Sequence, residues 1–274
     1  IKFWKNCGSR GGKVAKVSVL ILAKNEEKFI GACIKSVADF ADEVVVIDDF
    51  STDATAQISA DLGARVVQRA LAGDWGGQQT FAIKQARCDW VFFIDADERS
   101  TPALSAEIKK ILDRDDKSIA WRTARLSYFW GQPLRHGGWF PDYVTRLFPT
   151  AGSYVTGFVH PQIHHTCAEK DFSESAYLVH YPYRDWNHYF NKLNFYTTLA
   201  AKKAHEQGKT ANILDMIFHP LWASFRMYIL RGGFLDGRIG FILAGFHYFY
   251  TMAKYVKLYY YDKKNLHITE ADDV

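Results

Sequence analysis

The sequence predicts an α/β fold, in which a mostly parallel sheet is flanked by helices, followed by a C-terminal helical extension. Two observations carry this prediction. Short apolar runs suited to buried strands alternate with segments of helical periodicity in the first half of the chain, which indicates right-handed βαβ units. From residue 181 onward the pattern is helical and rich in aromatic residues. We therefore expect one α/β domain at residues 1–185 and the extension at residues 186–274.

The apolar pattern gives the expected positions of the strands and helices in the α/β domain. Residues 1–15 are polar and unpatterned, which predicts a loosely held lead-in. After them we expect strands at 17–22, 43–47, 64–67 and 90–94, helices at 25–37, 56–62, 80–86 and 102–112, and a glycine-containing loop at 73–79. Parallel strands end at one edge of a sheet, where open α/β sheets bind their ligands.

Acidic residues directly follow two of these strands. Asp48 and Asp49 close the second strand, and Asp95, Asp97 and Glu98 close the fourth. An Asp-x-Asp pair supplies hard oxygen ligands of the kind that Mg²⁺ or Mn²⁺ prefers while the ion also holds a diphosphate. Each cluster alone is also consistent with helix capping. Two clusters at one sheet edge favour a metal and nucleotide site.

Composition and charge are those of a folded globular protein. The chain has 274 residues, 48% of them hydrophobic and 23% charged, and its net charge of +4 is too small to indicate nucleic-acid binding. Neither GxxxxGK[ST] nor GxGxxG follows an expected strand, so P-loop and dinucleotide-binding functions are not favoured. The four cysteines are widely scattered, which predicts neither a disulfide framework nor a zinc site. No export signal is recognisable, and a reducing cytosol is expected.

The expected helices of the extension carry apolar and aromatic faces with basic residues at their edges. Neither residues 213–230 nor residues 238–261 contain 18 consecutive apolar positions, so a membrane span is not expected. The basic residues favour helices that lie in the interface of an anionic membrane: Arg226, Arg231, Arg238, Lys254 and Lys257. The alternative is a helical subdomain packed on the α/β domain or against a second copy of the chain.

The order of several motifs resembles a known family. The segments VSVLILAKNEEKFI, VVVIDDFSTDAT and DWVFFIDADE are similar to those of the family 2 inverting glycosyltransferases of GT-A fold. The segments GGWFPDYVTRLF, HYPYRDWNHYFNKLNFYTTLAA and FRMYILRGGFLDGRIGFILA resemble a bacterial subgroup that includes lipopolysaccharide core glucosyltransferases. The resemblance extends from Val17 to about Leu258.

This resemblance implies roles for particular residues. Asp49 matches the acid that contacts the nucleotide base, and Asp95 and Asp97 match the family's DxD motif, with Asp97 as the direct ligand of Mg²⁺ or Mn²⁺. The implied donor-binding set, for a nucleotide sugar of the UDP type, consists of Leu22, Lys24, Glu26, Asp49, Gln79 and Asp95. GT-A enzymes sometimes add a histidine to the metal, for which His160 and His180 are the first candidates ahead of His164 and His165.

The resemblance also implies a catalytic pair. Asp142 matches the base that deprotonates the acceptor hydroxyl, and Arg146 matches the arginine that approaches the donor diphosphate. The chain departs from the subgroup at Gln78, Gln79 and Thr80, where a basic residue and Asn are expected, and at Pro161, where Glu is expected after His160. If that Glu is the base in relatives, Asp142 fills the role here.

The expected function is metal-dependent, inverting transfer of a sugar, with UDP-glucose the first donor considered, to a lipopolysaccharide-core or related glycolipid acceptor. The expected location is the cytoplasmic face of the bacterial inner membrane, bound peripherally to its anionic surface. Two alternatives remain open. One is a transferase that acts on polyprenyl phosphate, and the other is an idle sugar- or membrane-binding module.

Overall fold

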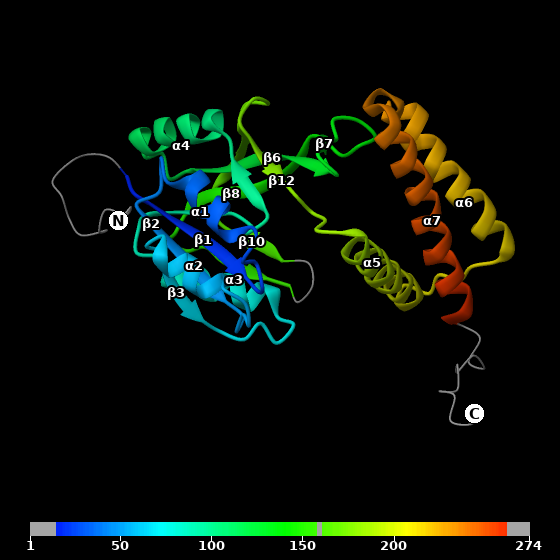
Figure 1. Cartoon of the computed structure of the whole chain (residues 1–274), viewed down its shortest axis with the longest axis horizontal. Helices are drawn as coiled ribbons and strands as arrows, with labels where there is room; N and C mark the ends of the chain where they lie inside the picture. Colours follow the sequence, from blue (N-terminus) through cyan, green and yellow to red (C-terminus); the bar gives the residue numbers. More distant parts are fainter. Residues whose placement is uncertain (1–14, 158–160, 262–274) are drawn as a thin grey trace. The chain divides into compact units, whose positions relative to one another are not determined.

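The structure is a computed structural model that describes residues 15–157 and 161–261. The chain forms two compact units (Figure 1). Unit 1 comprises residues 1–127 and 141–181, and unit 2 comprises residues 128–140 and 182–274. The segment 128–140 thus leaves the first unit and belongs to the second, which the sequence pattern did not predict. The expected division at residue 185, as a boundary between functional domains, stays a prediction.

Unit 1 is built on a mixed, mostly parallel sheet. Its main path runs in the order β3-β2-β1-β4-β8-β6-β12-β5, and β11 pairs with β6 outside that path. The strands of the path are β1 (Val17–Ala23), β2 (Glu43–Asp48), β3 (Arg65–Gln68), β4 (Trp90–Phe93), β5 (Glu98–Ser100), β6 (Ile119–Phe129), β8 (Asp142–Pro149) and β12 (Tyr177–His180), and β11 is Ala168–Asp171. A separate antiparallel pair is formed by β9 (Tyr154–Thr156) and β10 (Gln162–His164).

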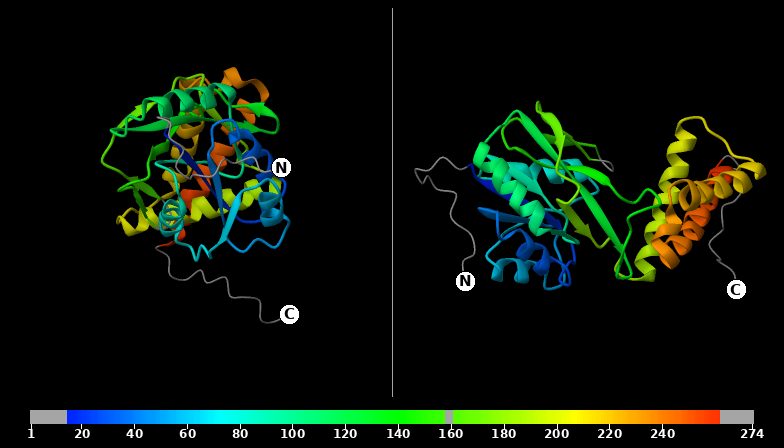
Figure 2. Two further views of the ribbon diagram at one scale, coloured as in Figure 1. Left: turned by 90° about the vertical axis from the view of Figure 1, so that its left-hand side faces the viewer. Right: turned by 90° about the horizontal axis from the view of Figure 1, so that it is seen from above.

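Helices cover both faces of this sheet (Figure 2). The helices of unit 1 are α1 (Ile30–Val37), α2 (Thr55–Asp61), α3 (Trp75–Gln85) and α4 (Pro102–Arg114). Alternate β1 residues point to opposite faces: Val19 packs in the core that α1 and α4 cover, and Leu20 packs in the core under α3. The β1, β2 and β4 side chains are nearly all buried, as expected for parallel strands with helices on both sides.

The glycine-containing segment before β4 is helical, and the expected loop at 73–79 is therefore wrong over most of its length. Helix α3 begins at Trp75 because the Asp74 side chain caps it, with Asp74 Oδ1 accepting from the backbone N–H of Gly77 at 2.8 Å. Gly76 tolerates no side chain, since a Cβ there would lie 2.8 Å from the Gly157 carbonyl oxygen. The glycines thus mark a close backbone approach within a helix.

Unit 2 consists of helices that pack side by side. It contains β7 (Gln132–Pro133), α5 (Trp186–Glu206), α6 (Ile213–Phe225), the π-helical turn η1 (Arg226–Leu230), the 3₁₀ turn η2 (Gly233–Asp236) and α7 (Gly237–Tyr261). Its core joins Phe129 and Leu134 of the inserted segment to Tyr189, Met227 and Leu243 of the helices. The predicted C-terminal helices are confirmed. None of the helices in residues 15–157 and 161–261 is both long and apolar enough to cross a membrane.

Two of the described cysteines differ in burial. Cys33 is a buried free thiol, and Cys167 is a half-buried free thiol.

Candidate active site

The two acidic clusters meet at one edge of the sheet because β1 lies between their strands. Strand β1 pairs in parallel with β2 on one side and with β4 on the other. Asp49 follows β2, and Asp95 and Asp97 follow β4, so all three lie near the carboxyl end of β1. Lys24, the residue after β1, reaches Asp49 with its Nζ atom at 2.8 Å from Oδ2.

Asp48 and Asp49 have different environments although they are neighbours. Asp48 is fully buried and accepts from the backbone N–H of Ser51 at 3.2 Å. Asp49 remains partly exposed and accepts from Lys24 and from the backbone N–H of Leu71 at 3.0 Å. Burial alone would raise the pKa of Asp49, but these hydrogen bonds hold it below its usual value. Asp49 is therefore a charged hydrogen-bond acceptor at the sheet edge, whereas Asp48 stabilises the turn that follows β2.

The other residues of the implied donor-binding set lie on three elements. Leu22 is the penultimate residue of β1 and is half-buried, and Lys24 is exposed beyond it. The backbone N–H of Glu26 donates to Thr55 Oγ1 at 2.7 Å, which ties the turn before α1 to the start of α2. Gln79 lies half-buried in α3, next to the buried Gln78. The structure thus places these residues, and their contacts with a donor stay a prediction.

His180 is the histidine that lies beside the DxD motif. Strand β12 carries it opposite Ser127 of β6 and Glu98 of β5. Its Nδ1 atom lies 3.2 Å from Ser127 Oγ, and its Nε2 atom lies 3.8 Å from Asp97 Oδ2. A hydrogen bond at one ring nitrogen that orients the other is the usual support of a metal-binding histidine.

The remaining candidate histidines lie elsewhere or are not described. His164 stacks on Tyr154 and its Nε2 atom lies 2.6 Å from Thr156 Oγ1. His165 lies 3.5 Å from Glu169. His160 falls outside the described residues.

The acidic residues at this sheet edge supply only part of the ligand set that a divalent cation needs. Within residues 15–157 and 161–261, no three His, Cys, Asp or Glu side chains are grouped to hold a metal ion. Asp97 and His180 lie close enough together to contact one ion, and one Asp95 oxygen is engaged by Arg146. Such a set suits Mg²⁺ or Mn²⁺ that is bound by one or two protein groups together with substrate phosphates and water.

A row of alternating charges connects Asp142 to the DxD motif. Arg125 Nε donates to Asp142 Oδ2 at 2.9 Å, and Arg125 Nη1 lies 3.8 Å from Glu98 Oε1. Arg146 Nη2 donates to Glu98 Oε1 at 2.7 Å and to Asp95 Oδ2 at 2.6 Å. The row therefore reads Asp142, Arg125, Glu98, Arg146, Asp95. Its end members are each 46% exposed at the side chain, whereas Glu98 is fully buried.

Burial and pairing shift the pKa values along this row in opposite directions. Burial raises the pKa of Glu98 to about 7, with the Asp95 charge adding to the rise and Arg146 opposing it. Burial also acts to raise the pKa of Asp95, but the charge and hydrogen bond of Arg146 outweigh it and hold the pKa below its usual value. Asp95 thus stays ionised and is oriented by Arg146.

From the sequence, Glu98 was placed in the acidic cluster without a role of its own, and Arg125 was not identified. Glu98 Oε2 accepts from the backbone N–H of Asp95 at 3.0 Å, so Glu98 shapes the turn that carries the DxD motif. Arg125 lies on β6, which pairs with β8 in a register that aligns Arg125 with Asp142. That antiparallel pairing has no local sequence signature. Arg146 itself is buried, and its role toward a donor diphosphate stays a prediction.

The geometry can be compared with known proteins. A model of the glycosyl transferase family 2 matches residues 18–168, which is more than half of the chain and contains both acidic strand ends. The chain belongs to this family. It is therefore a glycosyltransferase, and the α/β fold of GT-A type that the sequence predicted is confirmed.

Relatives of this glycosyltransferase are bacterial. It is 32% identical over 257 residues to the lipopolysaccharide core biosynthesis glycosyltransferase LpsC of Rhizobium meliloti, covering 89% of this chain and 92% of that one. It is 30% identical over 252 residues to an uncharacterized glycosyltransferase of Rickettsia prowazekii, covering 87% and 86%. The structure of S. aureus TarS 1-349 in complex with UDP-GlcNAc is 17% identical, covers 90% of this chain and 92% of that one, and has a TM-score of 0.46.

Proposed function

We propose that this glycosyltransferase moves a sugar, with inversion, from a UDP-sugar to a lipopolysaccharide-core or related glycolipid acceptor, with Mg²⁺ or Mn²⁺ at Asp97. The observation that carries the proposal is that Asp49, Asp95 and Asp97 all lie near the carboxyl end of β1, with the His180 ring beside Asp97. Similarity to LpsC supports the acceptor class.

Each side chain has a distinct task in the proposed reaction. Asp49, with Lys24 beside it, accepts hydrogen bonds from the base or ribose of the donor. Asp97 and His180 would hold the cation, which would supply positive charge next to the leaving diphosphate. Asp95 is held by Arg146 next to this position. The row of charges fixes the spacing between the donor side and Asp142.

Asp142 is the proposed general base. Within the described residues Arg125 contacts Asp142 through Oδ2 alone, which leaves Oδ1 of a half-exposed carboxylate for the acceptor hydroxyl. As the hydroxyl oxygen attacks the anomeric carbon, its proton passes to Asp142 while the bond to the diphosphate oxygen breaks on the opposite face. Inversion follows from this single displacement.

Substitution of Asp142 tests the base directly. We expect Asp142→Asn to lower the kcat of transfer by about 10²- to 10⁴-fold with little change in donor affinity, because the carboxamide cannot accept the proton. Asp171→Asn is the matched control, since Asp171 pairs with Arg122 of β6 as Asp142 pairs with Arg125. Wild-type kcat in Asp142→Asn, measured with saturating donor and acceptor, would remove Asp142 from this role.

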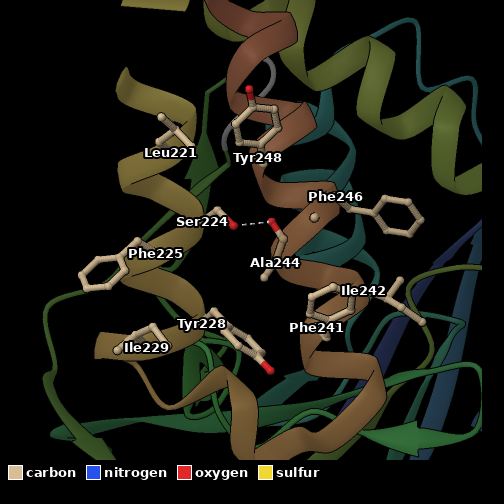
Figure 3. Close-up of a pocket in the computed structure, with 11 residues that line it drawn as sticks. Leu221, Ser224, Phe225, Tyr228, Ile229, Phe241, Ile242, Ala244, Phe246 and Tyr248 are labelled. Carbon is tan, nitrogen blue, oxygen red and sulfur yellow. Dashed lines mark hydrogen bonds between the residues drawn. The ribbon is translucent and has the colours of Figure 1, made fainter. Parts of the chain in front are cut away.

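Membrane association is the second part of the proposal, and helix α6 supports it. The apolar side chains of α6 point outward, and Pro220 is the one α6 residue that is buried. The exposed residues recur at helical spacing: Ile213, Leu214, Ile217, Phe218, Leu221, Trp222 and Phe225. An apolar groove of about 580 Å³ lies between α6 and α7, bridged by a hydrogen bond from Ser224 Oγ to the Ala244 carbonyl oxygen (Figure 3).

This face fits the interfacial layer of a bilayer better than water. A helix with one strongly apolar face lies in the headgroup region, and nearby basic residues favour an anionic leaflet. Arg226 and Arg231, both exposed, follow directly after α6. The proposed location is therefore peripheral, on the cytoplasmic face of the inner membrane, where a glycolipid acceptor is available.

Flotation with liposomes tests this location. We expect Phe218→Ser to lower partitioning onto anionic liposomes about tenfold, because Phe218 is 63% exposed on the apolar face and loses its transfer free energy. Phe195→Ser is the control, since Phe195 is 58% exposed on α5. Equal effects of the two changes, or a wild-type protein that forms dimers and never floats, would assign the face to a protein interface instead.

A further inference from the structure

Unit 2 contains a second pocket, on a different side of α6 from the apolar groove. Its volume is about 420 Å³, and it is lined by α6, η1, α7 and the loop before β8. Three basic side chains, Arg226, Arg231 and Lys254, line it together with His247 and Thr251. None of its described lining residues is Asp or Glu. The lining of this pocket is therefore cationic.

The three cations lack carboxylate partners within the described ranges 15–157 and 161–261. The nearest acid on α6, Asp215, pairs instead with His219 at 3.2 Å. Burial, followed by the charge of Lys209, lowers the pKa of Lys254. Burial, followed by the charges of Arg231 and Arg226, lowers the pKa of His247. Arg231 and Arg226 thus disfavour a further positive charge at His247, whereas they would attract an anion into the pocket.

The loop at the mouth of the pocket holds Arg231 in place. The backbone N–H of Gly137 donates to the Arg231 carbonyl oxygen at 2.9 Å. Gly138, with φ of +85°, leaves space for the guanidinium, since a Cβ there would lie 2.5 Å from Arg231 Nη1. Asp236 anchors the loop by accepting from the His136 backbone N–H at 2.9 Å and contacting its ring at 2.7 Å. One wall of the pocket is therefore preorganised.

We propose that this pocket binds the phosphate group of an anionic lipid or lipid-linked acceptor. Guanidinium groups match the paired oxygens of phosphate, and Lys254 and Thr251 add an ammonium and a hydroxyl. Trp222, 56% exposed at the pocket, belongs also to the apolar face of α6. A phosphate at headgroup level would thus lie beside side chains that enter the acyl region. The inference rests on the proposed membrane association and not on the transfer reaction.

Vesicle binding by the full chain, without donor, tests the pocket. Phosphatidylcholine vesicles contain either phosphatidic acid, a phosphate monoester, or phosphatidylserine adjusted to the same surface potential. We expect wild-type protein to bind the phosphatidic acid vesicles more tightly. Arg226→Gln/Arg231→Gln should lose about tenfold more affinity for them than Arg135→Gln/Arg238→Gln, which removes equal charge from unit 2 outside the pocket.

The outcomes distinguish a specific phosphate site in the pocket from general electrostatic attraction to the vesicle surface. Equal losses in the two double variants, or no preference for phosphatidic acid, would overturn the proposal. The charge-preserving Arg226→Lys/Arg231→Lys variant should lose part of the affinity, because lysine lacks the guanidinium fork. Stabilisation of the wild type by inorganic pyrophosphate, lost in the pocket variant while vesicle binding is unchanged, would assign the site to a soluble phosphate. Turnover of the sugar donor, measured without vesicles, tests the transferase activity independently of vesicle binding.

Discussion

Asp97→Asn is expected to lower kcat/KM for sugar transfer by at least about 10³-fold at saturating Mn²⁺ or Mg²⁺. The substitution removes the carboxylate that is proposed to hold the cation, and with it several kcal/mol of charge stabilisation in the transition state. The side chain of Asp97 is 25% exposed and lies 3.8 Å from His180, so the fold should tolerate the change. Steady-state kinetics over a range of metal concentrations measures the effect.

The comparison variant is Asp113→Asn, an exposed acid near the end of α4. It makes the same chemical change and should leave kcat/KM at the wild-type value. If Asp97→Asn kept more than about a tenth of wild-type activity with an unchanged metal dependence, the cation would have to bind elsewhere.

Arg146→Met is expected to destabilise the protein by about 3–5 kcal/mol. The change leaves Glu98 and Asp95 without their common counterion, and an uncompensated buried charge is costly. The double variant Arg146→Met/Glu98→Gln should regain at least half of the loss, because it also removes the central buried carboxylate. Urea denaturation of both variants gives the free energies of unfolding.

Arg122→Met provides the control for this prediction. Arg122 forms a surface ion pair with Asp171 and is 39% exposed, so its loss should cost less than about 1 kcal/mol. A double variant no more stable than Arg146→Met alone would show that Glu98 and Arg146 do not act as a pair.

The sheet edge proposed to bind the donor was predictable because the sequence features that mark it are local. Asp49 and Asp97 each follow an apolar run, and parallel strands bring such positions to one edge without further information. The charge row was not predictable in the same way. Arg125 meets Asp142 only through the β6–β8 register, and Glu98 meets Arg146 across segments 48 residues apart. Contacts between segments so far apart in the chain leave no periodicity in the sequence.

In the helical region, too, the sequence predicted the elements but not their contacts with distant parts of the chain. Periodicity located α5, α6 and α7 correctly, because a helix buries or exposes residues at a fixed spacing. It did not reveal that the segment 128–140 belongs to unit 2, nor that α6 turns its apolar side outward. An apolar stripe has the same pattern whether it faces a core, a membrane or a partner. The segment joins unit 2 through Phe129 and Leu134, which pack among residues of the helices.

The most direct test of the donor and metal site is the thermal stability of the wild-type protein with nucleotide sugars. Ligand at about a hundred times its dissociation constant stabilises the folded state by about 2.7 kcal/mol. We expect one UDP-sugar to raise the Tm most, only when Mn²⁺ or Mg²⁺ is present, and not in Asp97→Asn. An equal rise in the presence of a chelator, or no rise with any nucleotide sugar, would contradict a metal-dependent donor site at the end of β1.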